Sequence, residues 1–145
     1  MPYIDRDGVR IHYEVAGDGP AVLLSHGYGA SGRMWADQVA ALTPSWKVIT
    51  WDMRGHGGSD SPEDPALYSA ELTIGDMAAI LDACDVEQAV IGGLSLGGFM
   101  SLAFHLTHPN RTRALMLFDT GPGYRSDEAR DQWNAYAEKQ AKRFE

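Results

Sequence analysis

The sequence predicts an α/β fold built on a doubly wound, mostly parallel sheet. Two uninterrupted apolar runs, at 21–25 and 114–118, are typical of parallel strands that are buried on both faces. Segments with helical spacing of apolar residues stand between such runs. Strands that alternate with helices imply parallel pairing through right-handed crossovers. The chain has 145 residues, which is enough for one domain with a hydrophobic core.

The N-terminal residues predict a β-hairpin at the edge of this sheet. Strands are expected at 3–5 and 9–15, joined through residues 7–8, an Asp-Gly pair suited to positive φ. The buried strand at 21–25 follows. A helix is then expected to begin near Ser31, whose residue type makes a reasonable N-cap.

The middle of the chain predicts a strand, a polar loop and a helix. Residues 47–51 form an apolar run, and residues 52–59 are too rich in glycine for a regular element. Apolar residues then repeat at helical spacing from about Thr73, with Thr73 and Asp76 as an approximate capping pair. Loops at the ends of strands commonly carry functional residues, so 52–59 is a candidate functional loop.

The stretch Gly93-Leu94-Ser95-Leu96-Gly97 lies between an apolar strand at 88–92 and a long apolar helix at 96–107. A turn this tight leaves no room for side chains at Gly93 and Gly97, and it exposes the hydroxyl of Ser95 at a helix N-terminus. Free N–H groups there favour a developing oxyanion. The pattern therefore favours a nucleophilic serine, although a glycine-rich turn that only packs the helix on its strand has the same composition. The helix is apolar nearly all round and is expected to be covered.

The chain is expected to end in a buried strand at 114–118, a turn at 119–123 and a charged helix at 127–145. Trp133, Tyr136 and Phe144 are the larger apolar side chains of this last helix. The predicted strand ends place polar residues on one edge of the sheet, where ligands of such folds bind. They are His26, Asp52, Ser95 and Asp119.

The composition excludes several classes of function. A net charge of −8 disfavours nonspecific binding to nucleic acid or to an anionic membrane. Cys84 is the single cysteine and is expected to be a small buried apolar residue. The N-terminus lacks a signal-peptide pattern and no apolar run is long enough to span a bilayer, so a cytoplasmic protein is expected. The histidines lack metal-site spacing, and neither a metal nor another cofactor is expected.

Three motifs together resemble those of the α/β-hydrolase superfamily. They are residues 26–29 (His-Gly-Tyr-Gly), residues 52–59 (Asp-Met-Arg-Gly-His-Gly-Gly-Ser) and residues 93–98 (Gly-Leu-Ser-Leu-Gly-Gly). The resemblance covers almost the whole chain and is greatest to the branch of capped esterases, lactonases, carbon–carbon hydrolases, perhydrolases and epoxide hydrolases. It implies the first six strands of an α/β-hydrolase fold. Residues 1–124 would be a partial core domain and residues 125–145 the start of a helical cap.

The resemblance implies roles for individual residues. Ser95 would be the nucleophile, and the N–H groups of Tyr28 and Leu96 would form the oxyanion hole. Serine at this position argues against epoxide hydrolases and dehalogenases, which use aspartate there. The expected function is a serine hydrolase of carboxylic ester-type bonds that acts through an acyl-enzyme on a small ester or lactone. Asp119 is either the catalytic acid or a residue that stabilises the following turn.

The sequence stops where the family's cap would begin, before the strands that supply its histidine. The chain therefore resembles the N-terminal half of a serine hydrolase, and whether it is itself an enzyme stays open. His26 and His56 are expected to shape their loops, whereas His12 is expected on a strand surface. His105 and His108 lie about three helical turns from Ser95, more than ~10 Å along the helix.

Three residues have two interpretations each. Tyr28, Trp35 and Leu94 either line an apolar acyl pocket or belong to the core. The cap, which shapes specificity in such enzymes, is absent from the sequence, so the acyl group is not identified.

Two other functions compete with serine hydrolysis. Gly27, Gly29 and Gly32 match G-x-G-x-x-G, and Asp52 ends the next strand, as in a dinucleotide-binding site. Alternatively the chain is a noncatalytic piece. The strand at 114–118 would then be an exposed apolar edge, which predicts a homo-oligomer or a second chain covering it.

Overall fold

A single six-stranded sheet forms the centre of the molecule. The structure is a computed structural model and describes residues 2–143. The strands are β1 (Tyr3–Arg6), β2 (Val9–Ala16), β3 (Ala21–Ser25), β4 (Lys47–Trp51), β5 (Ala89–Leu94) and β6 (Thr112–Phe118). Their order across the sheet is β1-β2-β4-β3-β5-β6. Strands β3 to β6 run parallel and the β1–β2 hairpin pairs antiparallel, which confirms the predicted fold class.

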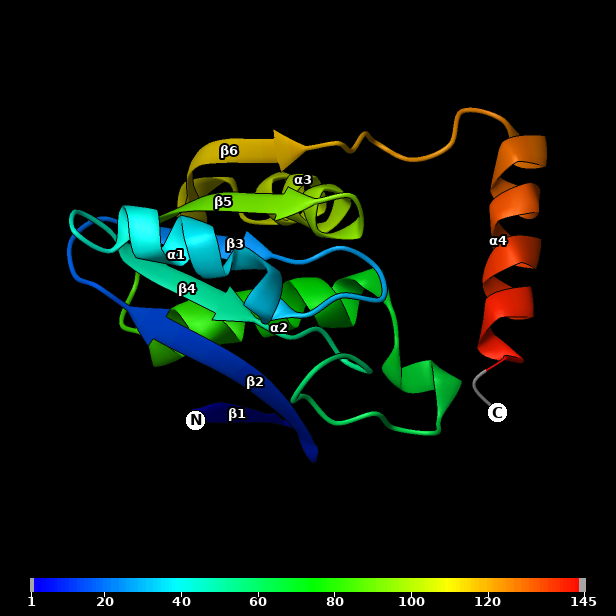
Figure 1. Ribbon diagram of the computed structural model, residues 1–145, viewed down its shortest axis with the longest axis horizontal. Coiled ribbons are helices and arrows are strands. Elements are labelled where there is room, and N and C mark those ends of the chain that lie inside the picture. The colour runs from blue at the N-terminus through cyan, green and yellow to red at the C-terminus, as the bar shows by residue number, and fades with distance from the viewer. Residues whose placement is uncertain (1, 144–145) are drawn as a thin grey trace.

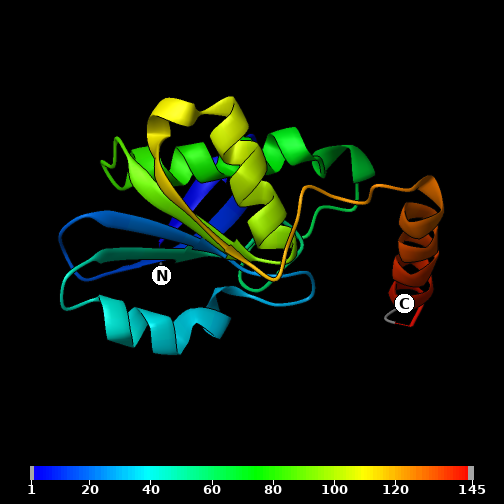
Figure 2. The same ribbon diagram turned by 90° about the horizontal axis from the view of Figure 1, so that it is seen from above.

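Helices cover both faces of this sheet. They are α1 (Ala36–Leu42), α2 (Ala70–Ala83), α3 (Leu96–Thr107) and α4 (Asp127–Ala141), with short 3₁₀ turns η1 (Gly32–Trp35), η2 (Pro65–Leu67) and η3 (Pro109–Arg111). Figures 1 and 2 show α1 on one face and α2 with α3 on the other. A larger core cluster includes residues of α2 and α3, and a smaller one includes Trp35 beside β3 and β4, with Val39 packed against it. The strands thus have apolar neighbours on both faces.

The N-terminal hairpin and the buried third strand agree with the sequence-based prediction. Asp7 and Gly8 join β1 to β2 with φ of 56° and 86°. A left-handed pair of this kind matches the right-handed twist of the two strands. All five residues of β3 are buried, as expected for a central parallel strand.

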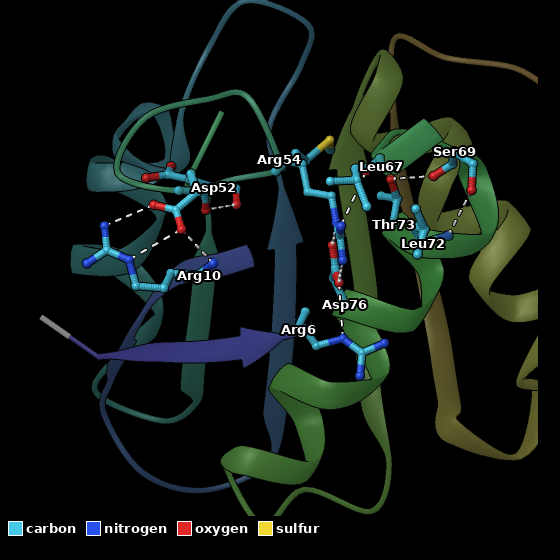
Figure 3. A network of polar contacts seen from close by, with 12 residues as sticks. Arg6, Arg10, Asp52, Arg54, Leu67, Ser69, Leu72, Thr73 and Asp76 are labelled. Carbon is cyan, nitrogen blue, oxygen red and sulfur yellow. Dashed lines mark hydrogen bonds and ion pairs between the residues drawn. The ribbon is translucent and has the colours of Figure 1, made fainter. Parts of the chain in front are cut away.

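Two helix starts differ from the sequence-based prediction. Residues after Ser31 first form the 3₁₀ turn η1, and the Ser31 side chain makes no capping hydrogen bond. Helix α2 begins at Ala70, earlier than predicted, because Ser69 Oγ accepts the Leu72 N–H at 3.1 Å and caps it. The predicted capping pair is wrong, since Asp76 is fully buried and binds two arginines. Figure 3 shows the Ser69 cap beside Thr73.

The last strand and the helix after β5 are more exposed than predicted. β6 is an edge strand, and Leu117 and Phe118 are 44% and 37% exposed. On α3, Leu106 is 75% exposed. Within residues 2–143 no element packs on the outer side of β6. The prediction of an apolar edge is therefore confirmed, whereas burial of this strand and full cover of α3 are not found.

Helix α4 lies apart from the sheet, beyond the carboxyl ends of the parallel strands (Figures 1 and 2). An extended segment after β6 leads to it, and Ser126 caps it through a 3.2 Å hydrogen bond from the Ala129 N–H. It ends at Ala141, so Phe144, which was expected in this helix, lies outside the described residues. Of the helices in residues 2–143, none combines the length and apolar character needed to cross a bilayer.

Candidate active site

Ser95 occupies the sharp turn between β5 and α3. Its φ of 51° and ψ of −113° lie in a region that residues with side chains seldom adopt. The residue is exposed, and its side chain makes no hydrogen bond to the helix N-terminus. Its N–H donates to Phe118 O at 3.0 Å, and its carbonyl accepts the Thr120 hydroxyl at 2.6 Å. The main chain thus holds the strained residue in place while leaving the hydroxyl outside the capping interactions of the helix.

The glycines around Ser95 allow strand and helix to cross at contact distance. A Cβ atom on Gly93 would overlap the main chain of Gly97. A Cβ on Gly97 would overlap the carbonyl groups of Ser25 and His26 at the end of β3. The predicted steric reason for these glycines is therefore seen in the structure. It brings the start of α3 against the end of β3, next to the loop that follows.

That loop, residues 26–29, lies beside Ser95. A Cβ built on Gly27 would stand 3.8 Å from Ser95 Cβ and 3.6 Å from the Leu94 side chain. Tyr28 follows directly and is 52% exposed. Leu96 is the first residue of α3, so its N–H has no acceptor within the helix. The two N–H groups predicted for an oxyanion hole thus come from segments that flank Ser95.

Asp119 lies at the same edge of the sheet. The register pairs Leu94 with Phe118, so the residues that follow, Ser95 and Asp119, end neighbouring strands. Asp119 is exposed and has a φ of 47°. Among residues 2–143 no histidine is hydrogen-bonded to its carboxylate. The Asp119 carboxylate is therefore exposed and able to accept a hydrogen bond, and no histidine of the described residues donates one.

The Asp52 carboxylate links three other segments of the chain through hydrogen bonds. Its carboxylate accepts the N–H groups of Gly32 at 2.6 Å and Gly58 at 2.8 Å, and it contacts His12 Nδ1 at 2.9 Å. Burial opposes its ionisation, but the hydrogen bonds from Gly58, Gly32 and His12 outweigh burial and lower the pKa of Asp52. Because both oxygens are engaged, this carboxylate is poorly placed to bind a ribose. The dinucleotide interpretation thus loses its acidic residue.

His12 was expected on a strand surface, and this prediction is wrong. Only 9% of the residue is exposed, and its Nδ1 pairs with Asp52. A cavity of about 260 Å³ lies there, lined by residues that include Tyr3, His12 and Asp52. Ser95 is not among its lining residues. The alternation of apolar and polar residues along β2 predicted which face of the sheet His12 lies on. It gave no indication that a loop would cover that face.

Arg54 anchors the loop after β4 to α2. Its guanidinium donates to both carboxylate oxygens of Asp76 at 2.7 and 2.9 Å, and Arg6 reaches the same carboxylate at 3.2 Å (Figure 3). Asp76 and Arg54 are almost fully buried. Bidentate pairing of this kind fixes orientation as well as distance. The network therefore fixes where the 52–59 loop leaves β4.

The three residues predicted for an acyl pocket have different surroundings in the structure. Trp35 is 5% exposed, belongs to the core cluster on the α1 face and lies 5.8 Å from the Phe118 ring between centroids. Leu94 is half-buried against the same cluster. Only Tyr28 presents an exposed ring, which meets Trp133 of α4 edge to face at 5.9 Å. The geometry favours a core role for Trp35.

None of the histidines in the described residues is placed to deprotonate Ser95. Both ring nitrogens of His26 and of His56 are hydrogen-bonded to the main chain. His12 is on β2, three strands from β5, or about 14 Å at the usual strand spacing. His105 is ten residues along α3, or about 15 Å from Ser95 along the helix, and His108 lies farther still, at the C-cap of α3. Within residues 2–143 no group of three or more potential metal ligands is found.

Comparisons with known proteins agree with this architecture. A family model described as "alpha/beta hydrolase fold" matches residues 20–144. Epoxide hydrolase 2 of Siraitia grosvenorii is 33% identical over 114 residues, which are 78% of this chain and 36% of that protein.

Solved structures are similar in the same way. The enol-lactonase of Burkholderia xenovorans LB400 superposes with a TM-score of 0.76 and 35% identity, covering 82% of this chain and 46% of that one. A thermophilic esterase of Thermogutta terrifontis gives a TM-score of 0.85 and 29% identity, covering 96% of this chain and 53% of that one. The chain thus spans about a third to a half of the length of these proteins.

Proposed function

Because the chain belongs to the family of proteins with the α/β-hydrolase fold, we propose that Ser95 is the nucleophile of a serine hydrolase of carboxylic ester-type bonds, like an esterase or lactonase. The observation that carries this proposal is the backbone of Ser95. A φ of 51° on an exposed serine above a helix N-terminus is strained, and such strain persists where the surroundings over-determine it. The glycine contacts that enforce it supply that constraint.

The proposed reaction proceeds in two steps. Ser95 Oγ attacks the carbonyl carbon while a base takes its proton, and the carbonyl oxygen becomes an oxyanion that accepts hydrogen bonds from the Tyr28 and Leu96 N–H groups. The base then protonates the alkoxide that leaves. Water adds to the acyl-enzyme, the base takes a proton from the water, and the acid departs as Ser95 regains its hydrogen. The chemistry needs no cofactor.

Serine at this position favours acyl over epoxide substrates. Attack of an alkoxide on an epoxide would leave an ether, which water does not cleave under mild conditions. Attack on an acyl carbon leaves an ester, which water cleaves with the same catalytic groups. The similar proteins include both an epoxide hydrolase and an enol-lactonase, and this argument favours small esters and lactones as substrates.

The base is proposed to come from outside this sequence. No histidine of residues 2–143 is free and close enough to serve, as the hydrogen bonds and strand order above show. Asp119 is proposed as the acid that orients an incoming histidine, because it stands beside Ser95 with an exposed side chain. A hydroxyl without a base is a weak nucleophile, so the isolated chain is expected to react slowly.

The unpaired edge of β6 is the proposed place for pairing with a further strand. Leu117 and Phe118 are exposed there, and edges of this kind pair with further strands. Either a second copy or another chain segment can occupy it. Residues 125–145 are proposed to begin a cap over the site, because Trp133 of α4 contacts Tyr28.

Trapping the acyl-enzyme tests the substrate class. Purified chain is mixed with a p-nitrophenyl ester, a lactone or styrene oxide, quenched in acid and digested, and the peptide that contains Ser95 is weighed. Acyl adducts with ester and lactone, absent with the epoxide and absent in Ser95→Ala, support the proposal. An epoxide adduct at Ser95, or equal acylation of Ser95→Ala, contradicts it.

Chemical rescue tests the location of the base. Imidazole is added in increasing concentration during acylation by the p-nitrophenyl ester, with Ser95→Ala subtracting the reaction of imidazole itself. A Ser95-dependent rate that rises with imidazole is expected, since imidazole in solution can take the proton of the Ser95 hydroxyl. A fast rate without imidazole, unchanged by its addition, would place the base inside the chain and contradict this part of the proposal.

A further inference from the structure

Two histidines cross-link the loop after β3 to the loop after β4. His26 Nε2 accepts the Met53 N–H at 3.0 Å, and His56 Nε2 accepts the Gly29 N–H at 3.2 Å. The contacts are reciprocal, because each loop supplies one histidine and one main-chain donor. The two imidazole rings lie 4.9 Å apart between centroids, so the two links are neighbours.

The hydrogen bonds also define the tautomer of each ring. His26 Nδ1 contacts Gly27 O at 2.7 Å, and His56 Nδ1 contacts Arg54 O at 3.0 Å. A carbonyl oxygen can only accept, so each Nδ1 carries the hydrogen and each Nε2 is left as an acceptor. Burial lowers the pKa of His26, which keeps that ring neutral and its Nε2 able to accept.

These contacts hold the two peptide units on either side of the Tyr28 Cα. The first unit contains the Gly27 carbonyl and the Tyr28 N–H, which point in opposite directions because the peptide bond is planar and trans. His26 Nδ1 and the Ala30 N–H both donate to that carbonyl, at 2.7 and 3.1 Å. The second unit carries the Gly29 N–H that His56 accepts. The direction of the Tyr28 N–H is therefore fixed from both sides.

We propose that His56, together with His26, is a positioning residue that holds the Tyr28 N–H in the direction needed to stabilise the oxyanion. This inference rests on the proposed function, in which the Tyr28 N–H is an oxyanion donor. His56 does not touch the reacting atoms and acts through Gly29. A preorganised donor matters for rate because it stabilises charge that develops only in the transition state. The Tyr28 ring meets the His56 ring edge to face, with 6.1 Å between the ring centroids.

Two amide substitutions at His56 separate its two hydrogen bonds. In His56→Gln the side-chain oxygen reaches the former Nε2 position and can accept the Gly29 N–H. In His56→Asn the shorter amide reaches the former Nδ1 position, so it keeps the donor to Arg54 O and loses the acceptor for Gly29. His56 is only half-buried, and both variants are expected to fold.

The first readout is NMR on the chain itself, without substrate. The ¹⁵N shifts of His56 should show an unprotonated Nε2 and a protonated Nδ1. Exchange of the Gly29 amide should be about five- to tenfold faster in His56→Asn than in wild type, as expected for loss of one hydrogen bond, and near wild type in His56→Gln. A protonated Nε2, or equal Gly29 exchange in both variants, would overturn the proposal.

The second readout is the saturating rate of Ser95 acylation, measured with imidazole present. His56→Asn should lower this rate about tenfold with little change in the half-saturating ester concentration, and His56→Gln should restore most of it. Equal rates in wild type and His56→Asn would overturn the positioning role. If wild type itself is not acylated while the ordering of Gly29 exchange holds, the proposed function fails and the positioning geometry stands.

Discussion

At Ser95 the backbone conformation is more unusual than the residue type. A serine hydroxyl is common on protein surfaces, but a serine with φ of 51° and ψ of −113° is not. Strain of this type is worth roughly 1–3 kcal/mol, and the contacts at Gly93 and Gly97 maintain it. The residue types around the turn made this geometry predictable. Nothing local to the sequence revealed that His12 would be buried against Asp52, because that contact joins β2 to a distant loop.

Replacing Ser95 with glycine should stabilise the protein. Glycine adopts this backbone conformation with little strain, and part of the gain is offset by its more flexible unfolded state, so the free energy of unfolding should rise by about 1 kcal/mol. Urea denaturation measures the change. Ser95→Ala keeps a Cβ and should stay within about 0.5 kcal/mol of wild type. Equal stability of the two variants would show that the turn is not strained.

Asp52 should make the protein sensitive to acid. Its pKa in the folded state lies below the ordinary value of 3.8, so its contribution is present above that pH and disappears as pH falls through the folded-state pKa. Asp52→Asn should lower the free energy of unfolding by about 2 kcal/mol at neutral pH, because donors at Gly32 and Gly58 lose a charged acceptor. The variant should also lose stability less steeply below about pH 4. Urea titrations across pH test this, and an unchanged acid slope would contradict it.

At the scale of elements, β5, the turn and α3 form the unit that positions the candidate site. β5 is buried between β3 and β6, and the glycine contacts bring α3 onto the end of β3. The predicted α3, at 96–107, agrees with the structure to the residue. The start of α2 was less predictable, since both Ser69 and Thr73 are acceptable caps and the buried pairing of Asp76 with arginines decides between them. Long-range ion pairs leave no local signature.

A side chain at Gly93 should disrupt this unit. In Gly93→Ala the new methyl group would overlap the Gly97 main chain, which cannot move without displacing α3. A loss of about 3 kcal/mol or more is expected, comparable with severe overpacking of a core. Gly121→Ala is the matched control, because its Cβ would have no atom within 4 Å. Thermal unfolding followed by circular dichroism compares the two, and similar melting temperatures would contradict the prediction.

At the scale of the whole molecule, helices cover both faces of the sheet, and β1 and β6 are its two edge strands (Figures 1 and 2). The cover of the two faces was predictable from the spacing of apolar residues in the sequence. The apolar edge at β6 was predictable too, but the segment that pairs with it and the group that acts as catalytic base are proposals, since no local sequence pattern identifies either. The proteins to which the chain is similar are about two to three times as long as the matched parts. The cytoplasmic location remains a prediction.

The open edge should make the chain self-associate. Leu117 and Phe118 are exposed on β6, and such an edge pairs with a second copy when nothing else is available. Sedimentation velocity over a wide concentration range should show oligomers. Leu117→Lys should shift them toward monomer, since a charge on an edge strand opposes pairing. Val15→Lys, at an exposed site on β2, serves as control. A wild-type monomer at every concentration would contradict the proposal.

The most direct test of the account is whether Ser95 reacts as a nucleophile. Wild-type chain and Ser95→Ala are treated with a fluorophosphonate, with and without imidazole, and their intact masses are measured after folding is verified by circular dichroism. The account predicts a single adduct on wild type, formed faster with imidazole, and none on Ser95→Ala. Folded wild type that stays unlabelled even with imidazole, or equal labelling of Ser95→Ala, would contradict the central claim.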